Sequence, residues 1–384
     1  MEKISSLMPV KNRLKFIDAA RSIAILLMLE GHFITLTLDK SSLNTNNTIY
    51  SIWYFVKGFT APMFFSVSGI IFVYLLSRTK EKGFFRIVRI KKGFRRSIEL
   101  LFWGYMLQVN ILNFNQYISL EINSWFFAFH VLQCIGTGIV ITLLIFGLYK
   151  LINYGKLYIY YLISGTVLFL LYSLLKDLPE DTYFPNETYE LFQNMFHGPY
   201  SIFPIIPWVG FVLYGGAIGS LISDYNEHIM SKWASALFIL TGLLLHYGTL
   251  WPVLYEIDLI FDTSFVLING LMGRFGQVLI VVGILMRLEK YFKRSNSLFL
   301  KIGQNTLPIY VIHVMVLYSG FFGVGLNNVL KEKLTPLESI FGAVCFIAFF
   351  VVLINYYHYA EAAWSKFKKK IYEVIVSFRK EGTV

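Results

Sequence analysis

The stretch DAARSIAILLMLEGHF, residues 18–33, decides the fold, because it is apolar enough for a lipid bilayer yet carries four ionisable side chains. Ionisable residues inside such a span are costly, so by default they indicate a functional site. Arg21 and His32 are eleven residues apart, which places them on nearly the same helical face, ~16 Å apart along the axis. Asp18 shares that face and is spaced for an ion pair with Arg21. Glu30 faces the opposite side and needs another partner.

The composition indicates that the whole chain, and not only this stretch, belongs to a membrane protein. Of the 384 residues, 56% are hydrophobic and only 15% are charged, whereas a soluble domain carries about 25% charged residues. Apolar runs of membrane-spanning length repeat along the chain. The sequence therefore predicts an all-α fold, a polytopic integral membrane helical bundle of about 10–11 transmembrane helices. The ten expected spans are 17–38, 52–77, 97–114, 125–150, 157–175, 201–222, 232–250, 262–286, 297–320 and 336–357, and an eleventh helix could lie near 250–262.

The basic residues predict the orientation. The net charge is +11, and Lys and Arg cluster in segments that fall on one side of a ten-span bundle, above all in 78–96. Cytoplasmic loops are enriched in Lys and Arg, so both termini are expected in the cytoplasm. This clustering between spans indicates membrane lipid as a partner and no nucleic acid. Segment 78–96 is a topology anchor on anionic lipid, an interfacial helix, or a contact for an anionic ligand.

Other features narrow the function classes. Cys134 and Cys345 lie in apolar segments without the spacing of a disulfide or metal site, so no metal is expected. The first apolar stretch is long and interrupted by charge, which argues against a cleavable signal peptide. A multi-pass transporter or flippase of a small anionic or glycan-linked substrate would also explain charges in the membrane. However, the two halves of the chain show no inverted repeat and no paired broken helices, which argues against that alternative.

Five short motifs occur in order along the chain. The first is the R-x10-H pattern of Arg21 and His32. The others are APMFFSVSG at 61–69, FHVLQCIG at 129–136, FPIIPWVGFVLYGGAIG at 203–219 and GQNTLPIYVIH at 303–313. Together they resemble the transmembrane acyltransferase superfamily, which includes the acyltransferase-3 proteins and the heparan-α-glucosaminide N-acetyltransferase-like proteins. The chain departs from many relatives at Ser22, where they have glycine. It has no histidine in 33–51, so His32 is the residue that matches the active histidine.

The resemblance implies a single transmembrane acyltransferase-like domain over residues 1–384, in the plasma or inner cell membrane. It implies transfer of an acyl group, usually acetyl, to a saccharide or glycolipid acceptor. The expected donor is acetyl-CoA or another acyl-CoA on the cytosolic side. A homo-oligomer is an open alternative to a monomer.

The catalytic residues expected from these motifs are two histidines and two hydroxyl groups. His32 is the expected general base or acyl carrier. His313 is a second histidine, three residues after Tyr310, for acceptor binding or proton transfer. Ser68 and Tyr310 are expected to stabilise the oxyanion. Structural roles in helix packing remain open for Ser68 and for the two histidines.

Mostly basic residues are expected to hold the phosphates of the donor, because arginine forks match phosphate oxygens. Asn305 and Ser66 are further candidates for contacts near the reacting carbonyl. Arg274 lies inside an apolar span and needs an anion, either Glu30, Glu99 or the ligand. The full expected donor-binding set is Arg21, Asp18, Arg78, Arg274 and Ser66, with part of segment 86–96.

Overall fold

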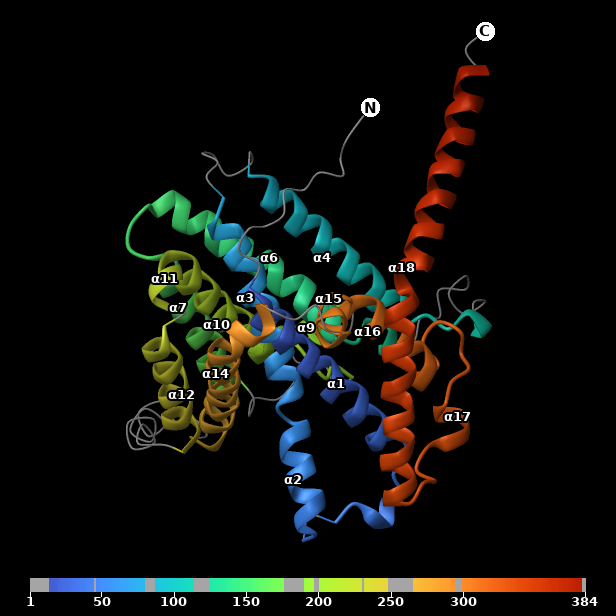
Figure 1. The fold of residues 1–384 in the computed structure, drawn as a ribbon, viewed down its shortest axis with the longest axis horizontal. Coiled ribbons are helices and arrows are strands. Elements are labelled where there is room, and N and C mark those ends of the chain that lie inside the picture. Colours follow the sequence, from blue (N-terminus) through green and yellow to red (C-terminus); the bar gives the residue numbers. More distant parts are fainter. Residues whose placement is uncertain are drawn as a thin grey trace.

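The computed structural model describes residues 14–44, 46–79, 87–113, 124–175, 190–196, 200–229, 231–247, 265–293 and 298–381. Within these ranges the chain is helical and forms no β-strand beyond two isolated bridges. The helices are α1 (Lys15–Thr37), α2 (Thr48–Lys57), α3 (Thr60–Ser77), α4 (Val88–Met106), α6 (Val131–Ile152), α7 (Leu157–Leu175), α9 (Glu190–Phe196), α10 (Ile205–Asp224), α11 (Asn226–Ile229), α12 (Lys232–Tyr247), α14 (Phe265–Lys293), α15 (Leu298–Gln304), α16 (Thr306–Tyr318), α17 (Asn327–Leu330) and α18 (Pro336–Glu381) (Figure 1).

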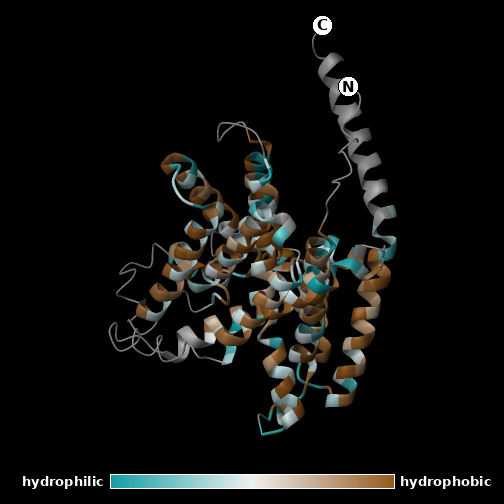
Figure 2. Cartoon of the chain, turned by 60° about the vertical axis from the view of Figure 1, so that its left-hand side comes forward, coloured by the Kyte–Doolittle hydropathy of each residue, from teal (hydrophilic) through white to brown (hydrophobic). Residues whose placement is uncertain are grey.

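Seven helical segments in the described part of the chain are long and apolar enough to cross a membrane. They are Lys15–Thr37, Thr48–Ser77, Val131–Ile152, Leu157–Leu175, Ile205–Asp224, Gly270–Phe292 and Pro336–Tyr357. Each coincides with an expected span, which confirms the prediction of an all-α polytopic membrane protein. Most residues along the helices of the bundle are hydrophobic, and hydrophilic residues gather mainly at helix ends and connections (Figure 2).

The other three expected spans are helical but differ from the prediction. Span 97–114 begins earlier, because α4 takes in the basic residues from Val88 onward as an amphipathic helix. Span 232–250 is α12, which has 16 residues. Span 297–320 is split into α15 and α16 at Asn305. The expected eleventh helix near 250–262 lies outside the described residues.

The break at Asn305 lies before Pro308 rather than at it. Pro308 is the third residue of α16. Proline is tolerated in the first turn of a helix, because the backbone N–H groups there have no helical partner. Pro308 therefore helps α16 to start, and the chain changes direction before it.

Helix α1 is central to the bundle and packs against α3, α14, α15, α16 and α18. Its start is capped by the buried carboxylate of Glu289 on α14, which accepts hydrogen bonds from the N–H groups of Lys15 (3.1 Å) and Phe16 (2.6 Å). At its end, the N–H of Leu334 donates to the carbonyl of Thr37 at 2.8 Å. Both ends of α1 are thus fixed by segments that are distant in sequence.

The end of α1 lies beside the start of α18, so these two packed helices run in opposite directions (Figure 1). The start of α1 and the far end of the Pro336–Tyr357 span therefore emerge at the same end of the bundle. That both termini lie on the cytoplasmic side of the membrane stays a prediction.

Small residues bring α3 and α10 into backbone contact. Gly69 of α3 faces the carbonyl of Val212, and Gly215 of α10 faces the carbonyl of Ser66. A β-carbon at either glycine would overlap the opposite backbone. Membrane helices gain packing energy from such close approach. One face of α3 is therefore fixed on α10, and the opposite face is left to line the space beside α1.

Two buried serines orient the helices on either side of that space. Ser22 of α1 accepts a hydrogen bond from the N–H of Gly303 at 2.9 Å, which ties α15 to the first turns of α1. Ser97 of α4 donates to the carbonyl of Gly136 on α6 at 2.8 Å. The first contact sets the position of α16, which follows α15, and the second sets the position of Arg96.

The cap on α1 can be tested with Glu289→Gln, which removes a negative charge from the start of the helix. Losing such a cap costs ~0.5–2 kcal/mol, so the variant should melt at a lower temperature in detergent micelles. Glu332→Gln is the matched control, because Glu332 pairs with the exposed Lys40 at 2.8 Å and exposed ion pairs contribute little. Equal melting temperatures for wild type and Glu289→Gln would contradict the cap.

Candidate functional site

A cavity of about 390 Å³ lies beside the first half of α1. Side chains from α1, α3, α4, α6, α15 and α16 line it, so it is built from segments far apart in the chain. We call it the Arg21 cavity. Its polar lining residues are Arg21, Ser68, Arg96, Gln304, Thr306 and Tyr310, and the remaining lining residues are Phe64, Ile71, Phe72, Leu75, Leu100, Leu132, Ile135, Ile139 and Leu307.

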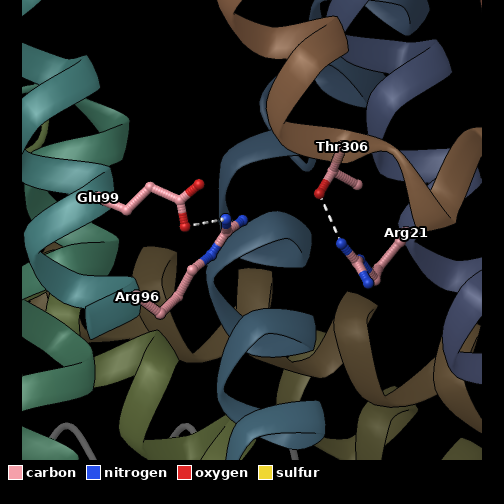
Figure 3. A network of polar contacts seen from close by, with 4 residues as sticks. All are labelled: Arg21, Arg96, Glu99 and Thr306. Atoms are coloured by element: carbon pink, nitrogen blue, oxygen red, sulfur yellow. Dashed lines mark hydrogen bonds and ion pairs between the residues drawn. The ribbon is translucent and has the colours of Figure 1, made fainter. Parts of the chain in front are cut away.

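Two guanidinium groups reach into the Arg21 cavity, one from α1 and one from α4 (Figure 3). Arg21 Nη2 donates to the hydroxyl of Thr306 at 2.6 Å, and Arg96 Nη1 donates to Glu99 Oε2 at 3.0 Å. Thr306 is the first residue of α16, so the positive end of that helix faces the same cavity. Guanidinium forks and helix N-termini both bind phosphate oxygens. The Arg21 cavity therefore suits a ligand that carries phosphate groups.

A second, smaller cavity of about 140 Å³ lies further along α1. We call it the His32 cavity; it is lined by Leu27, Met28, Gly31, His32, Lys57, Thr60, Ala61, Phe64, Val131, Phe203 and Tyr310. Phe64 and Tyr310 line both cavities. Arg21 and His32 therefore line two adjoining cavities that share a wall.

The two histidines expected at the site are in contact. His32 Nδ1 and His313 Nε2 are 3.3 Å apart, and the ring centroids are 5.2 Å apart. His313 is fully buried, and the ring of Tyr310 stands edge-on against it, with centroids 4.9 Å apart. Because His313 engages Nδ1 of His32, Nε2 is the nitrogen of His32 that remains for a ligand in the His32 cavity.

The side chains expected near the reacting carbonyl lie in different places, and not all of them line a cavity. Tyr310 lines both cavities, and Ser68 lines the Arg21 cavity while its hydroxyl donates to the carbonyl of Phe64 at 2.8 Å. Ser66 is fully buried where α3 meets α10, outside the lining of both cavities. Its side chain faces away because helical residues two apart do not share a face. Asn305 donates to the carbonyl of Lys301 at 2.8 Å.

Asp18 and Arg78 lie next to the Arg21 cavity without lining it. The buried carboxylate of Asp18 accepts a hydrogen bond from Gln304 Nε2 at 3.3 Å, and Gln304 lines the cavity. Arg78 follows the last turn of α3, three residues after the lining residue Leu75, and donates to the hydroxyl of Tyr74 at 2.5 Å. Asp18 therefore supports the cavity wall through Gln304, and Arg78 adds positive charge beside it.

Arg274, expected beside the donor, lies outside the lining of both cavities. Its Nη1 donates to the carbonyl of Phe55 at 2.8 Å and to Gln277 Oε1 at 3.2 Å. Its guanidinium lies 5.1 Å from the centre of the Phe55 ring. Arg274 therefore donates to a backbone carbonyl instead of the acidic side chain that was expected. This contact holds α2 against α14.

Glu30, whose partner the sequence leaves open, accepts a hydrogen bond from Trp53 Nε1 on α2 at 2.5 Å. Lys57, one turn further along α2, lies 5.4 Å from the centre of the Trp53 ring and is attracted by the charge of Glu30. Lys57 also lines the His32 cavity. Helix α2 therefore contributes a cation to the wall of that cavity.

Sequence reasoning did not single out the lining residues Lys57, Phe64, Gln304 and Thr306, and it included Arg96 only as part of segment 86–96. The opposite charges of Glu30 and Lys57 near apolar spans were an available signal for Lys57. Thr306 was not recognisable, because the helix start that exposes it depends on the break at Asn305. Among the described residues, no group of three or more His, Cys, Asp or Glu side chains is arranged to hold a metal ion.

Comparison with protein families gives a match to the catalytic region of heparan-alpha-glucosaminide N-acetyltransferase over residues 13–257. The match covers more than half of the 384-residue chain and contains Arg21, His32, Ser68 and Arg96. The α15–α16 wall of the two cavities lies beyond it. No curated protein matches the chain at a significant level.

A structural role for Arg274 predicts that Arg274→Gln destabilises the fold. Hydrogen bonds from a charged donor contribute ~1.5–3 kcal/mol, so the variant should melt at a clearly lower temperature in detergent micelles. Arg287→Gln, which removes an exposed arginine from the same helix, should melt like wild type. If Arg274→Gln and Arg287→Gln melt at the same temperature, Arg274 does not anchor α2.

Proposed function

The chain belongs to the family of heparan-α-glucosaminide N-acetyltransferase catalytic domains, and we propose that it transfers an acyl group, acetyl above all, from acyl-CoA to a saccharide or glycolipid acceptor. The family supports a membrane acetyltransferase that acts on a saccharide. One observation carries the rest of the proposal. A cavity with two arginines adjoins a cavity with a histidine, across the shared side chains of Phe64 and Tyr310.

The Arg21 cavity is the proposed donor site. Coenzyme A carries several phosphate groups, and guanidinium groups hold phosphates by charge-assisted, often bidentate hydrogen bonds. Arg21 and Arg96 would grip the phosphates, together with the hydroxyl of Thr306 at the start of α16. Asp18 acts through Gln304, and Arg78 attracts the anionic donor from beside the cavity. The thioester end of the donor then extends toward Phe64 and Tyr310.

His32 is the proposed general base. Its Nε2 takes the proton from the hydroxyl or amine of the acceptor as the acceptor atom attacks the thioester carbonyl. The negative charge that develops on the carbonyl oxygen needs hydrogen-bond donors, and the hydroxyls of Tyr310 and Ser68, both in the cavity lining, are the proposed donors. The intermediate then expels the thiolate of coenzyme A, which receives the proton from His32. The alternative role for His32 is that of acyl carrier, with the acyl group bound to Nε2 before the acceptor arrives.

His313 is the proposed positioning residue for His32. Nδ1 of His313 is buried and makes no hydrogen bond to any described residue, and Nε2 faces Nδ1 of His32. The proposed tautomer of His313 carries its proton on Nδ1. Nε2 of His313 is then unprotonated and accepts a hydrogen bond from Nδ1–H of His32 across the 3.3 Å contact. That tautomer leaves the lone pair of His32 on Nε2, where a general base needs it.

Replacing His32 with alanine should reduce kcat for acyl transfer by about 10²–10⁴-fold, the usual contribution of a general base. The KM for acetyl-CoA should change little, because the Arg21 cavity is intact. His313→Ala should reduce kcat less, and His313→Gln should recover part of that loss, because its carbonyl oxygen can accept from Nδ1–H of His32. The assay follows labelled acetyl transfer from acetyl-CoA to a panel of cell-envelope saccharides.

The matched control for the histidine variants is His228→Ala, because His228 is exposed on α11. That variant should keep wild-type kcat. Wild-type kcat in His32→Ala would contradict both proposed roles of His32. Equal kcat in His313→Ala and His313→Gln would contradict the positioning role of His313.

Replacing either cavity arginine with glutamine should weaken donor binding. A hydrogen bond to a charged group contributes ~1.5–3 kcal/mol, so Arg21→Gln and Arg96→Gln should each raise the KM for acetyl-CoA about tenfold or more. Arg95→Gln is the control, because Arg95 is exposed on α4 and outside the cavity lining. A KM equal to wild type in both cavity variants would place the donor elsewhere.

A further inference from the structure

The shared wall between the two cavities separates the proposed donor site from the proposed base. Only Phe64 and Tyr310 line both the Arg21 cavity and the His32 cavity among the described lining residues. We infer that Phe64 and Tyr310 form a partition that limits the transferred acyl group to a short chain. This inference rests on the proposed acyl-CoA-dependent function and adds the residues that set its donor specificity.

The two partition residues come from different helices and are held in different ways. Phe64 is half-buried on the face of α3 that also carries Ser68 and Ile71. Its backbone carbonyl accepts the hydroxyl of Ser68 at 2.8 Å, within a helix that is packed tightly on α10. Tyr310 is 7% exposed, and its ring stands against His313. The partition therefore touches the histidine pair on one side and the donor site on the other.

The volumes of the two cavities explain why the transferred acyl chain is limited to a short one. The Arg21 cavity, of about 390 Å³, has room for an extended ligand, whereas the His32 cavity holds only about 140 Å³. The attacking group of the acceptor and the reacting acyl group would have to share the smaller space beside His32. Its walls are packed side chains such as Met28, which is 5% exposed. A protein interior at this packing density does not enlarge without cost, so added methylene groups on the acyl chain meet the partition.

Phe64 is the better residue to change, because Tyr310 is also a proposed oxyanion donor. Truncation of Phe64 would join the two cavities and open space for further methylene groups, while Arg21, Arg96 and His32 stay in place. One methylene group in an apolar pocket is worth ~1–3 kcal/mol, or about 10–200-fold in kcat/KM. A change of acyl specificity is therefore large enough to measure.

The experiment compares acetyl-, butyryl- and hexanoyl-CoA as donors for the full-length protein in detergent micelles or nanodiscs. Phe64→Ala should raise the ratio of kcat/KM for butyryl-CoA over acetyl-CoA by about tenfold or more relative to wild type. Phe64→Leu, which keeps an apolar side chain, should give a smaller shift in the same direction and provides the test if Phe64→Ala fails to fold. Phe72→Ala is the matched control, because Phe72 lies on the same helix and lines only the Arg21 cavity.

The outcomes separate the inference from the function on which it rests. Wild-type protein that transfers none of the three acyl groups would contradict the proposed function itself. Active Phe64→Ala and Phe64→Leu variants with the wild-type chain-length ratio would overturn the partition and leave the function standing. The same shift in Phe72→Ala as in Phe64→Ala would also overturn it, since the limit would then lie in the donor cavity as a whole.

Discussion

The constraint that organises this protein is that α1 carries charged and polar groups through the interior of a membrane bundle. Such groups persist there only when protein partners or a polar cavity satisfy them. The partners come from α2, α15 and α16, so these helices are fixed on α1 by polar contacts as well as by apolar packing. The contacts are Asp18 with Gln304, Arg21 with Thr306, Glu30 with Trp53, and His32 with His313.

Because of these contacts, Arg21 and His32 lie in chemically different surroundings along α1. Near its start, Arg21 faces Arg96 and the N-terminus of α16, which favours an anion. Further along, His32 is held by a second, fully buried histidine in a small and mostly apolar cavity. A rigid helix keeps these two residues at a constant separation. A ligand that is anchored by its phosphates can thus present its reactive end at one defined depth, and positioning of this kind is a large part of catalysis.

Sequence reasoning reached the fold class and the helix that carries the site, because both follow from local patterns. The spacing of Arg21 and His32 placed them on one face, and the apolar runs placed seven spans correctly. It did not reach contacts that depend on how helices meet. Ser66 and Ser68 are both serines of the same motif, so the sequence does not distinguish them. The packing of α3 on α10 decides that Ser68 lines the cavity and Ser66 does not. Arg274 looked like a ligand-binding charge because its carbonyl partner on Phe55 is far away in the chain.

In the proposed reaction, the donor lies in the Arg21 cavity with its acyl end at the wall shared with the His32 cavity. The most direct test is an experimental structure of the protein with an acetyl-CoA analogue in which the thioester sulfur is replaced by a methylene group. We expect phosphate density between Arg21 and Arg96, and the ketone carbonyl next to Phe64 and Tyr310 on the path to His32. Phosphate density away from both arginines, with the acyl end directed away from His32, would contradict it.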